Sequence, residues 1–368
     1  MKVSWNWLSE YVDLDGLTPE EVGAKLTMAG LELDGIERLG TEFNALRVGH
    51  IQTIASHPEA DKLVLCQVDF GEGAVQIVCG AKNMKAGDKV PVIPAGESLP
   101  DGTKIKRGKI RGEVSNGMLC SARELGLSEE HDGLMILDPS LETGKPLADA
   151  LNLRDTVLEL SVTPNRGDAL SYLGIAREVA ALFGRKRSYP WAHPEDGKNE
   201  GPISAVIPNG DRINSLAHIS IEDSDGCSRY AAAVVENIKV APSPEWLTRS
   251  LEAIGLRPVN NIVDVTNFVL FETGQPLHAF DLNRLNGSEG RAQVVVRRAK
   301  AGETLQSIDH VERTLLESDL VIADAAGPIA IAGVMGGADS EVADETTSVL
   351  IECAHFDPQT VRKTAKRL

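Results

Sequence analysis

The chain has 368 residues, of which 42% are hydrophobic and 25% charged, and its formal net charge is −17. This length predicts two or three domains of roughly 100–200 residues each. Because there is no run of about 18 apolar residues and no basic-then-apolar leader, we expect neither a membrane span nor export. The acidic balance disfavours non-specific binding to polyanions such as DNA, although local basic patches can still contact RNA.

The first 40 residues predict a small α/β piece that lacks a core of its own. Thr18–Glu21 (TPEE) has the pattern of a capping box with proline in the first helical turn. About 40 residues bury too little surface to fold alone. A matching strand and helix are expected at Val157–Val162 and Ser171–Phe183. We therefore expect residues 1–40 and 152–190 to form one discontinuous domain.

Residues 41–151, between those two pieces, predict a small β-barrel. Short β runs alternate there with glycine and proline at nearly regular spacing, which is typical of barrels and sandwiches. The expected strands are Leu46–Ile54, Lys62–Phe70, Gln76–Cys79, Lys89–Ile93 and Gly133–Leu137. The barrel would be inserted into the discontinuous domain.

Basic residues recur along one segment of this barrel region: Lys104, Lys106, Arg107, Lys109 and Arg111. On an extended strand or its flanking loop, a two-residue period would align several of these charges on one face. Such a strip suits an RNA backbone. An edge strand protected by lysines is the alternative, and the strip alone favours neither.

Residues 203–368 predict a mixed α/β domain that follows a linker at Ser188–Pro202, rich in proline, glycine and charge. Ser243 with Pro244 indicates the start of a helix. Strands are expected at Gln293–Arg297, Leu320–Ala323, Ile329–Ala332 and Val349–Ile351, and a last helix at Asp357-Pro358. Because that helix has no glycine stop, we expect the chain to be part of a longer protein. The fold class is then α+β.

Two motifs in the barrel region, His57–Leu63 (HPEADKL) and Ser115–Ser121 (SNGMLCS), resemble the tRNA-binding OB domain. Over all 368 residues, the chain is similar in motif order and spacing to the bacterial phenylalanyl-tRNA synthetase β subunit. The motifs concerned are Ser4–Tyr11, Met28–Asp34, Ser161–Asp168, Val263–Asn267, Gly274–Asp281 and Ile351–Ala354.

The resemblance implies that this chain is the N-terminal portion of the β subunit of a cytoplasmic α₂β₂ ligase. That ligase uses ATP and Mg²⁺ and acts on tRNA(Phe). In that family the α subunit charges the tRNA, and the β subunit removes misattached tyrosine. A hydrophobic pocket rejects an added hydroxyl by only about a hundredfold, so a second sieve is needed. A carboxylate accepting the phenol O–H would serve, since a buried acceptor left unpaired by phenylalanine costs about 1–3 kcal/mol or more.

By motif, the resemblance implies that Glu352 accepts the phenol, while Asn267 and His278 place the attacking water. It also implies substrate contacts from Arg257, Gly336 and Gly337. The tRNA contacts implied in the barrel are Lys62, Lys104, Lys106, Arg107, Lys109, Arg111, Ser115 and Met118. No metal or cofactor is implied for this segment.

Each of these assignments has a structural alternative. His278 could be a hydrogen-bonded turn residue, Asn267 a turn cap, and Glu352 an exposed strand end. Asp168, with its neighbours in the Ser161–Asp168 motif, is interpreted as a structural turn network. Five dispersed cysteines without metal-ligand spacing predict free thiols in a reducing compartment.

Two other functions remain as alternatives to the ligase subunit. One is a free-standing tRNA-binding protein whose α/β region is only a scaffold. The other is a deacylase that acts in trans on released aminoacyl-tRNA.

Overall fold

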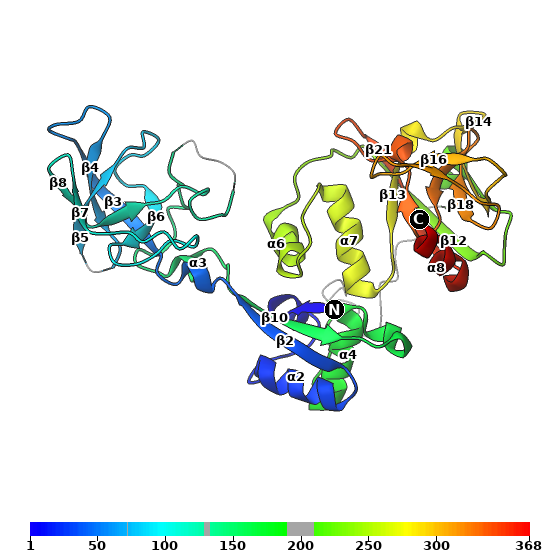
Figure 1. The fold of residues 1–368 in the computed structure, drawn as a ribbon, viewed down its shortest axis with the longest axis horizontal. Helices are drawn as coiled ribbons and strands as arrows, with labels where there is room; N and C mark the ends of the chain where they lie inside the picture. The colour runs from blue at the N-terminus through cyan, green and yellow to red at the C-terminus, as the bar shows by residue number, and fades with distance from the viewer. Residues whose placement is uncertain (72, 129–132, 190–209) are drawn as a thin grey trace. The chain divides into compact units, whose positions relative to one another are not determined.

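The computed structural model describes residues 1–71, 73–128, 133–189 and 210–368 (Figure 1). The chain divides into two compact units: Ile36–Val157, and Met1–Gly35 together with Leu158–Leu368. The α+β class is confirmed, with a nearly closed barrel in the smaller unit. The expected linker at Ser188–Pro202 lies outside the described residues except for its first two positions.

The N-terminal part of the larger unit is a three-stranded sheet with helices packed on it. The strand order is β1-β10-β2, so a strand that follows the barrel in sequence lies between two that precede it. The expected capping box is present: Thr18 accepts from the Glu21 backbone, and Glu21 accepts from that of Thr18. The elements are β1 (Lys2–Ser4), α1 (Trp5–Ser9), α2 (Pro19–Met28), β2 (Glu32–Leu39), β10 (Asp155–Ser161), η2 (Pro164–Ala169) and α4 (Tyr172–Phe183).

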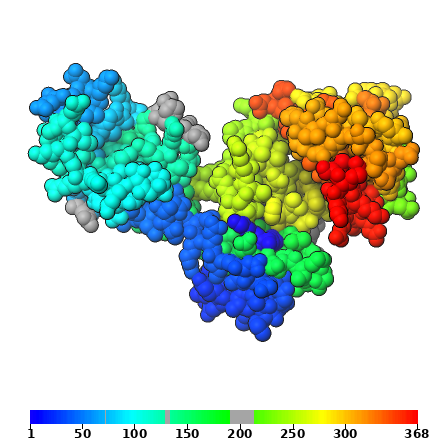
Figure 2. All heavy atoms as spheres, viewed as in Figure 1, coloured from blue at the N-terminus to red at the C-terminus, as the bar shows by residue number. Residues whose placement is uncertain are grey.

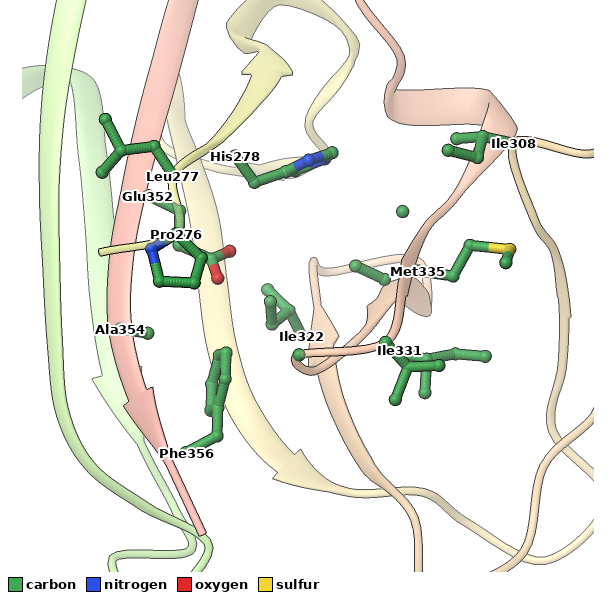
Figure 3. Close-up of a pocket in the computed structure, with 14 residues that line it drawn as sticks. Pro276, Leu277, His278, Ile308, Ile322, Ile331, Met335, Glu352, Ala354 and Phe356 are labelled. Carbon is green, nitrogen blue, oxygen red and sulfur yellow. The ribbon is translucent and has the colours of Figure 1, made fainter. Parts of the chain in front are cut away.

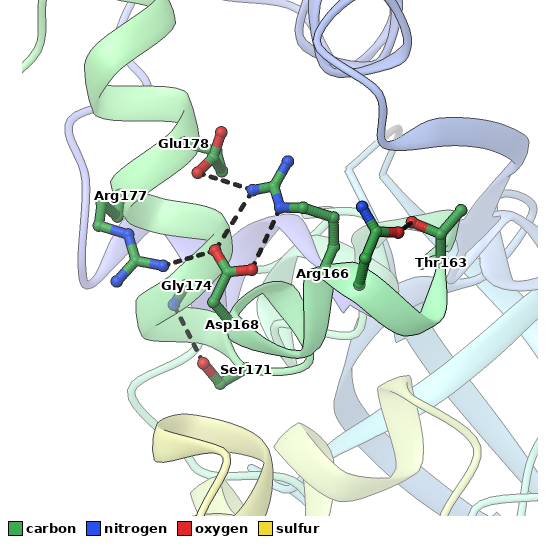
Figure 4. Close-up of polar contacts among 8 residues, drawn as sticks. Thr163, Arg166, Asp168, Ser171, Gly174, Arg177 and Glu178 are labelled. Carbon is green, nitrogen blue, oxygen red and sulfur yellow. Dashed lines mark hydrogen bonds and ion pairs between the residues drawn. The ribbon is translucent and has the colours of Figure 1, made fainter.

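An ion-pair network fixes the turn between β10 and α4 (Figure 4). Arg166 bonds Asp168 at 3.1 Å and Glu178 at 2.9 Å, and Arg177 bonds Asp168 at 2.8 Å. Ser171 caps α4 by accepting a hydrogen bond from the Gly174 backbone at 3.0 Å. The Ser161–Asp168 motif thus contributes to a local network that joins η2 to the first turns of α4.

The smaller unit is an antiparallel barrel with strand order β5-β4-β3-β6-β9. Asn116 closes it, because its backbone N–H donates to the Gln76 carbonyl on β5 at 3.0 Å. The expected strand at Gly133–Leu137 is wrong: only an isolated bridge between Leu137 and Lys89 forms there. The elements are η1 (Thr41–Phe43), β3 (Arg47–Ser56), β4 (Val64–Asp69), β5 (Ala74–Cys79), β6 (Lys89–Pro94), β7 (Gly108–Ile110), β8 (Glu113–Ser115), β9 (Gly117–Leu119) and α3 (Leu147–Ala150).

The C-terminal part of the larger unit contains two main sheets. One has the order β11-β15-β18-β19-β20, and the other is β12-β21-β13. Between them lies an apolar core that includes Phe280, Val294, Ile322 and Leu350. The helices are α5 (Gly210–Leu216), α6 (Glu245–Ala253), α7 (Asn261–Thr273), η4 (Leu282–Arg284), η5 (Ala338–Ser340) and α8 (Pro358–Arg367).

The strands of this part are β11 (Ala217–Ile221), β12 (Cys227–Glu236), β13 (His278–Asp281), β14 (Gly287–Ser288), β15 (Arg291–Arg298), β16 (Thr304–Gln306), β17 (Glu312–Thr314), β18 (Leu320–Ala323), β19 (Pro328–Ile331), β20 (Met335–Gly336) and β21 (Ser348–Phe356). Of the expected runs, β18 matches its own residue for residue, β15 and β21 extend theirs, and β19 begins and ends one residue earlier than expected. β14 also pairs with β15, and β16 forms a separate hairpin with β17.

Two expected helix starts differ in how they are capped. Asp357 caps α8 as expected. Figure 2 shows this helix, the last in the chain, at the surface. Its Thr364 and Arg367 side chains bond the buried Asp319. Ser243, by contrast, does not cap α6. Its hydroxyl donates to the buried Asp264 at 2.5 Å, and α6 begins one residue later than predicted. In the described part of the chain, no helix is both long enough and apolar enough to cross a membrane.

Candidate functional site

A cavity of about 380 Å³ lies between the two sheets of the C-terminal part (Figure 3). Its walls come from β13 and β21 on one side, and from β18, β19 and β20 on the other. Most of the lining is apolar, with His278 and Glu352 as the ionisable exceptions among the described lining residues. An apolar cavity of this size with few polar groups is typical of a small-molecule site.

The register of β21 puts Glu352 inside the protein. Side chains alternate between the faces of a strand, so Leu350, Glu352, Ala354 and Phe356 share one face. Leu350 belongs to the core and Phe356 packs against it, and Glu352 is only 7% exposed. Burial raises the pKa of the Glu352 carboxyl from 4.5 to about 7, although a hydrogen bond from Tyr230 opposes the rise. Glu352 is therefore not an exposed strand end.

His278 begins β13 and lies directly opposite Glu352 in the β13–β21 pair. Its ring contacts the Phe280 ring edge-on, with 4.5 Å between centroids. Burial lowers the pKa of the imidazole below its ordinary value, so the neutral form dominates at neutral pH. Neutral imidazole has one accepting and one donating nitrogen. His278 is thus a strand residue with a ring that lines the cavity, not a turn residue.

Gly336 provides the third part of the site. A Cβ atom added there would lie 2.8 Å from Cε1 and 3.1 Å from Nε2 of His278. The bare glycine therefore gives the imidazole its space. At Gly337 an added Cβ would instead lie 2.5 Å from the Ile329 carbonyl oxygen, so that glycine is required by backbone packing. Gly337 is not among the described residues that line the cavity.

Two expected site residues lie elsewhere in the larger unit. Asn267 is half-buried on α7, a helix that contacts β13, and Arg257 is exposed in the segment after α6. Neither belongs to the described lining of the cavity. The helical spacing of α7 orients Phe268 toward the N-terminal part, where its ring stacks on Trp7 at 4.4 Å. Among the expected catalytic and substrate-binding residues, His278, Glu352 and Gly336 are those that the structure brings together in the described lining of the cavity.

The basic residues of the barrel are exposed, but they do not form one continuous strand. Lys104, Lys106 and Arg107 lie in a loop, whereas Lys109 is on β7 and Arg111 is in the tight turn before β8. The segment is thus a loop followed by a short strand, and the alignment of its charges on one face stays a prediction. Arg111 has a φ of 50° at that turn.

His57 joins the Lys62 loop to the β7–β8 hairpin. The buried imidazole accepts from the Glu59 backbone at 3.1 Å through Nδ1, and its Nε2 lies 3.0 Å from the Ile110 carbonyl. These two contacts fit the tautomer with the proton on Nε2. His57 of the HPEADKL motif thus has a structural role, since it holds the start of the Lys62 loop against the β7–β8 hairpin.

Ser115 and Met118, the two remaining barrel residues of interest, contribute to the barrel itself. The Ser115 hydroxyl is buried, accepts from the Val78 backbone at 3.1 Å and donates to the Gly117 carbonyl at 2.9 Å. Met118, on β9, is partly buried and packs against one of the apolar clusters of the barrel unit. The Ser115 hydroxyl is thus engaged in barrel closure and is not directed at solvent.

Tyr230 is the site residue that the sequence did not reveal. Its hydroxyl donates to Glu352 Oε2 at 3.1 Å from the neighbouring strand β12. The two residues are 122 positions apart in the chain, and no motif connects them. The continuous apolar run Tyr230–Val235, which is typical of a buried strand, was the available signal.

Two family models match separate parts of this chain. A family model described as a tRNA binding domain matches residues 46–146, and a B3/4 domain model matches residues 226–368. The phenylalanine–tRNA ligase β subunits of Syntrophotalea carbinolica and Geobacter sulfurreducens are each 48% identical over 100% of this chain. The chain spans 44% of the length of either relative.

A solved N-terminal fragment of the phenylalanyl-tRNA synthetase β subunit from Pyrococcus horikoshii is 14% identical. It matches 58% of this chain and 61% of its own, with a TM-score of 0.29. The family is shown by the sequence relatives together with both domain matches. The chain belongs to the family of phenylalanine–tRNA ligase β subunits and corresponds to their N-terminal portion.

Proposed function

We propose that this chain is the tRNA-binding and editing portion of a phenylalanine–tRNA ligase β subunit. In this proposal the barrel contacts tRNA(Phe), and the cavity between the two C-terminal sheets hydrolyses tyrosine esterified to it. The observation that carries the proposal is the buried carboxylate of Glu352, which lies opposite His278 in an otherwise apolar cavity.

The cavity fits the side chain of an aromatic amino acid. Its apolar residues, such as Ile322 and Met335, would contact the ring, while Glu352 would accept the phenol hydroxyl. Phenylalanine would fill the same space and leave the carboxylate without that donor. A hydrogen bond to a charged group contributes about 1.5–3 kcal/mol, which corresponds to roughly a tenfold to hundredfold preference for tyrosine.

His278 would act on water rather than on the ring. Hydrolysis adds water to the ester carbonyl carbon, releases the free amino acid, and returns the proton to the terminal ribose oxygen of the tRNA. A neutral imidazole can accept a hydrogen bond from that water and orient it. Proton transfer by His278 is its second role in this proposal. Gly336 would keep the ring in place by leaving its space open.

The barrel is proposed to hold the tRNA backbone through its exposed cations. Support comes from the tRNA binding domain match, and from the His57 contact that joins the loop carrying Lys62 to the β7–β8 hairpin. We include Lys104, Lys106, Arg107, Lys109 and Arg111 in this surface. Cations of this kind bind phosphates with a strong dependence on salt.

Charging with phenylalanine is proposed to need an α subunit in an α₂β₂ assembly, together with ATP and Mg²⁺. This proposal follows from the similarity of the chain to phenylalanine–tRNA ligase β subunits. Within the described residues, no group of three or more His, Cys, Asp or Glu side chains is arranged to hold a metal ion. The ATP and metal chemistry is proposed to lie outside this portion, as the resemblance to the family implies.

The test is hydrolysis of tyrosyl-tRNA(Phe) and phenylalanyl-tRNA(Phe) by the full-length β subunit assembled with its α partner. Glu352→Ala and His278→Ala should leave tyrosyl-tRNA intact while charging with phenylalanine is unchanged. His355→Ala is the matched control, because His355 lies on the same strand but is exposed and bonds Ser228 at 2.9 Å. Hydrolysis at the wild-type rate by both site variants would refute the editing assignment.

A further inference from the structure

We propose that Tyr230 is a positioning residue for Glu352: its hydroxyl holds the carboxylate in one orientation, ready to accept a substrate phenol. The inference rests on the proposed function, since it assigns the origin of tyrosine selectivity within that site. Tyr230 belongs to none of the motifs that carried the family resemblance.

The geometry follows from the sheet register. On the β12–β21 pair, Ala232 lies opposite Glu352, and Tyr230 lies opposite Ala354. Tyr230 and Glu352 are therefore diagonal neighbours on the same face, a separation that an aromatic side chain spans. The Tyr230 hydroxyl lies 3.1 Å from Oε2. Figure 3 shows the carboxylate of Glu352 pointing from β21 into the cavity.

This hydrogen bond leaves room for a second donor. An ionised carboxylate has about four acceptor sites on its two oxygens. With Oε2 held by Tyr230, the carboxylate cannot rotate freely, so the remaining sites have fixed directions. A substrate phenol would then meet an acceptor whose orientation is already set, which reduces the ordering cost of binding.

The surroundings of Glu352 provide little other help for its negative charge. From β13 the neutral ring of His278 lies opposite, and the thiols of Cys227 and Cys353 are the other titratable groups that interact with the carboxylate. The facing sheet contributes apolar side chains such as Ile322 and Ile331. No Lys or Arg is among the described residues that line the cavity.

The ionisation of Glu352 therefore depends on Tyr230. The pKa of the carboxyl is about 7 with both effects present, since burial raises it and the Tyr230 hydrogen bond lowers it. Without that donor, the carboxyl would be largely protonated at neutral pH. A neutral carboxyl has no unpaired buried charge to penalise phenylalanine, and accepts a phenol less strongly.

The test is Tyr230→Phe, which removes the hydroxyl and keeps the ring, in the full-length β subunit assembled with α. The measured quantity is the ratio of kcat/KM for tyrosyl-tRNA(Phe) to that for phenylalanyl-tRNA(Phe), from pH 5 to pH 9. We expect the midpoint of the ratio to move up by about one pH unit and the ratio at pH 7 to fall about tenfold, as for one lost hydrogen bond to a carboxylate. ¹³C NMR of the Glu352 carboxyl should show the same pKa shift without any turnover.

Ser228→Ala is the matched control, since it also removes a hydroxyl bonded between β12 and β21, away from Glu352. It should leave the midpoint and the ratio unchanged. If Tyr230→Phe also leaves both unchanged while Glu352→Ala abolishes selectivity, the positioning role is wrong and the editing function stands. If Glu352→Ala retains wild-type selectivity, the proposed function fails, and with it this inference.

Discussion

Substitution of Gly336 by alanine tests the geometry of the cavity most directly. The backbone at Gly336 is not left-handed, so alanine is allowed there conformationally. The new methyl group would lie 2.8 Å from Cε1 of His278, about 0.7 Å inside the ~3.5 Å optimum for carbon contacts. The imidazole is the group that can move, although Phe280 limits it on one side at 4.5 Å.

The magnitude follows from this overlap. Tilting a side chain about 30° from its rotamer costs about 0.5–1.5 kcal/mol, which lowers the melting temperature by only a few degrees in a unit of this size. A misplacement of about 1 Å can reduce a reaction about a hundredfold. We therefore expect Gly336→Ala to slow tyrosyl-tRNA(Phe) hydrolysis about tenfold to a hundredfold, with little loss of stability.

Two other glycines of the same part of the chain, Gly337 and Gly327, provide controls for this variant. At Gly337 the added Cβ would lie 2.5 Å from the Ile329 carbonyl oxygen. That backbone atom cannot move away as a side chain can. Gly337→Ala should thus lower the melting temperature markedly. At Gly327 an added Cβ meets nothing within 4 Å, so Gly327→Ala should change neither property. The reasoning is refuted if Gly336→Ala hydrolyses at the wild-type rate, or if it unfolds as readily as Gly337→Ala.

Three further predictions concern charge and barrel closure. The pKa of Glu352 is raised in the folded state, so its ionisation destabilises the fold as pH rises from about 4.5 to 7. The free energy of unfolding of Glu352→Gln, measured with denaturant, should therefore gain roughly 2–3 kcal/mol relative to wild type between pH 5 and pH 8. A difference that stays constant with pH would contradict this. Ser115→Ala leaves the Val78 N–H without its acceptor and should cost the barrel about 1–3 kcal/mol in thermal unfolding; an unchanged melting temperature would show that the closing bond is dispensable. Lys106→Ala and Lys109→Ala should each weaken tRNA binding and reduce the slope of log K against log salt by up to about 0.9 without changing stability; an unchanged slope would remove that lysine from the RNA surface.

Local signals in the sequence predicted much of the fold. The capping box at Thr18 and the Asp357-Pro358 start of α8 depend on contacts within one helical turn, so the sequence contains all the information they need. The expected strand at Leu320–Ala323 matches β18 residue for residue for a similar reason, as a short fully buried apolar run. Ser243 shows the limit, because its hydroxyl donates to Asp264, 21 residues away.

The site was predictable only through the resemblance. His278 and Glu352 face each other because β13 pairs with β21 in one register, and a shift of one residue would turn Glu352 to the other face. Composition and periodicity do not specify the register of strands so far apart in the chain. Tyr230 was missed for the same reason, whereas Gly337 was selected by motif although its constraint is backbone packing.

The unfavourable burial of Glu352 and the proposed selectivity have one physical source. Raising its pKa from 4.5 to about 7 corresponds to roughly 3 kcal/mol of destabilisation once the carboxyl is ionised. In an apolar cavity with a single bound hydroxyl from Tyr230, that energy is recovered only when another donor arrives. A phenol supplies such a donor and a phenyl ring does not. The same burial that weakens the fold at neutral pH would therefore let the cavity distinguish tyrosine from phenylalanine.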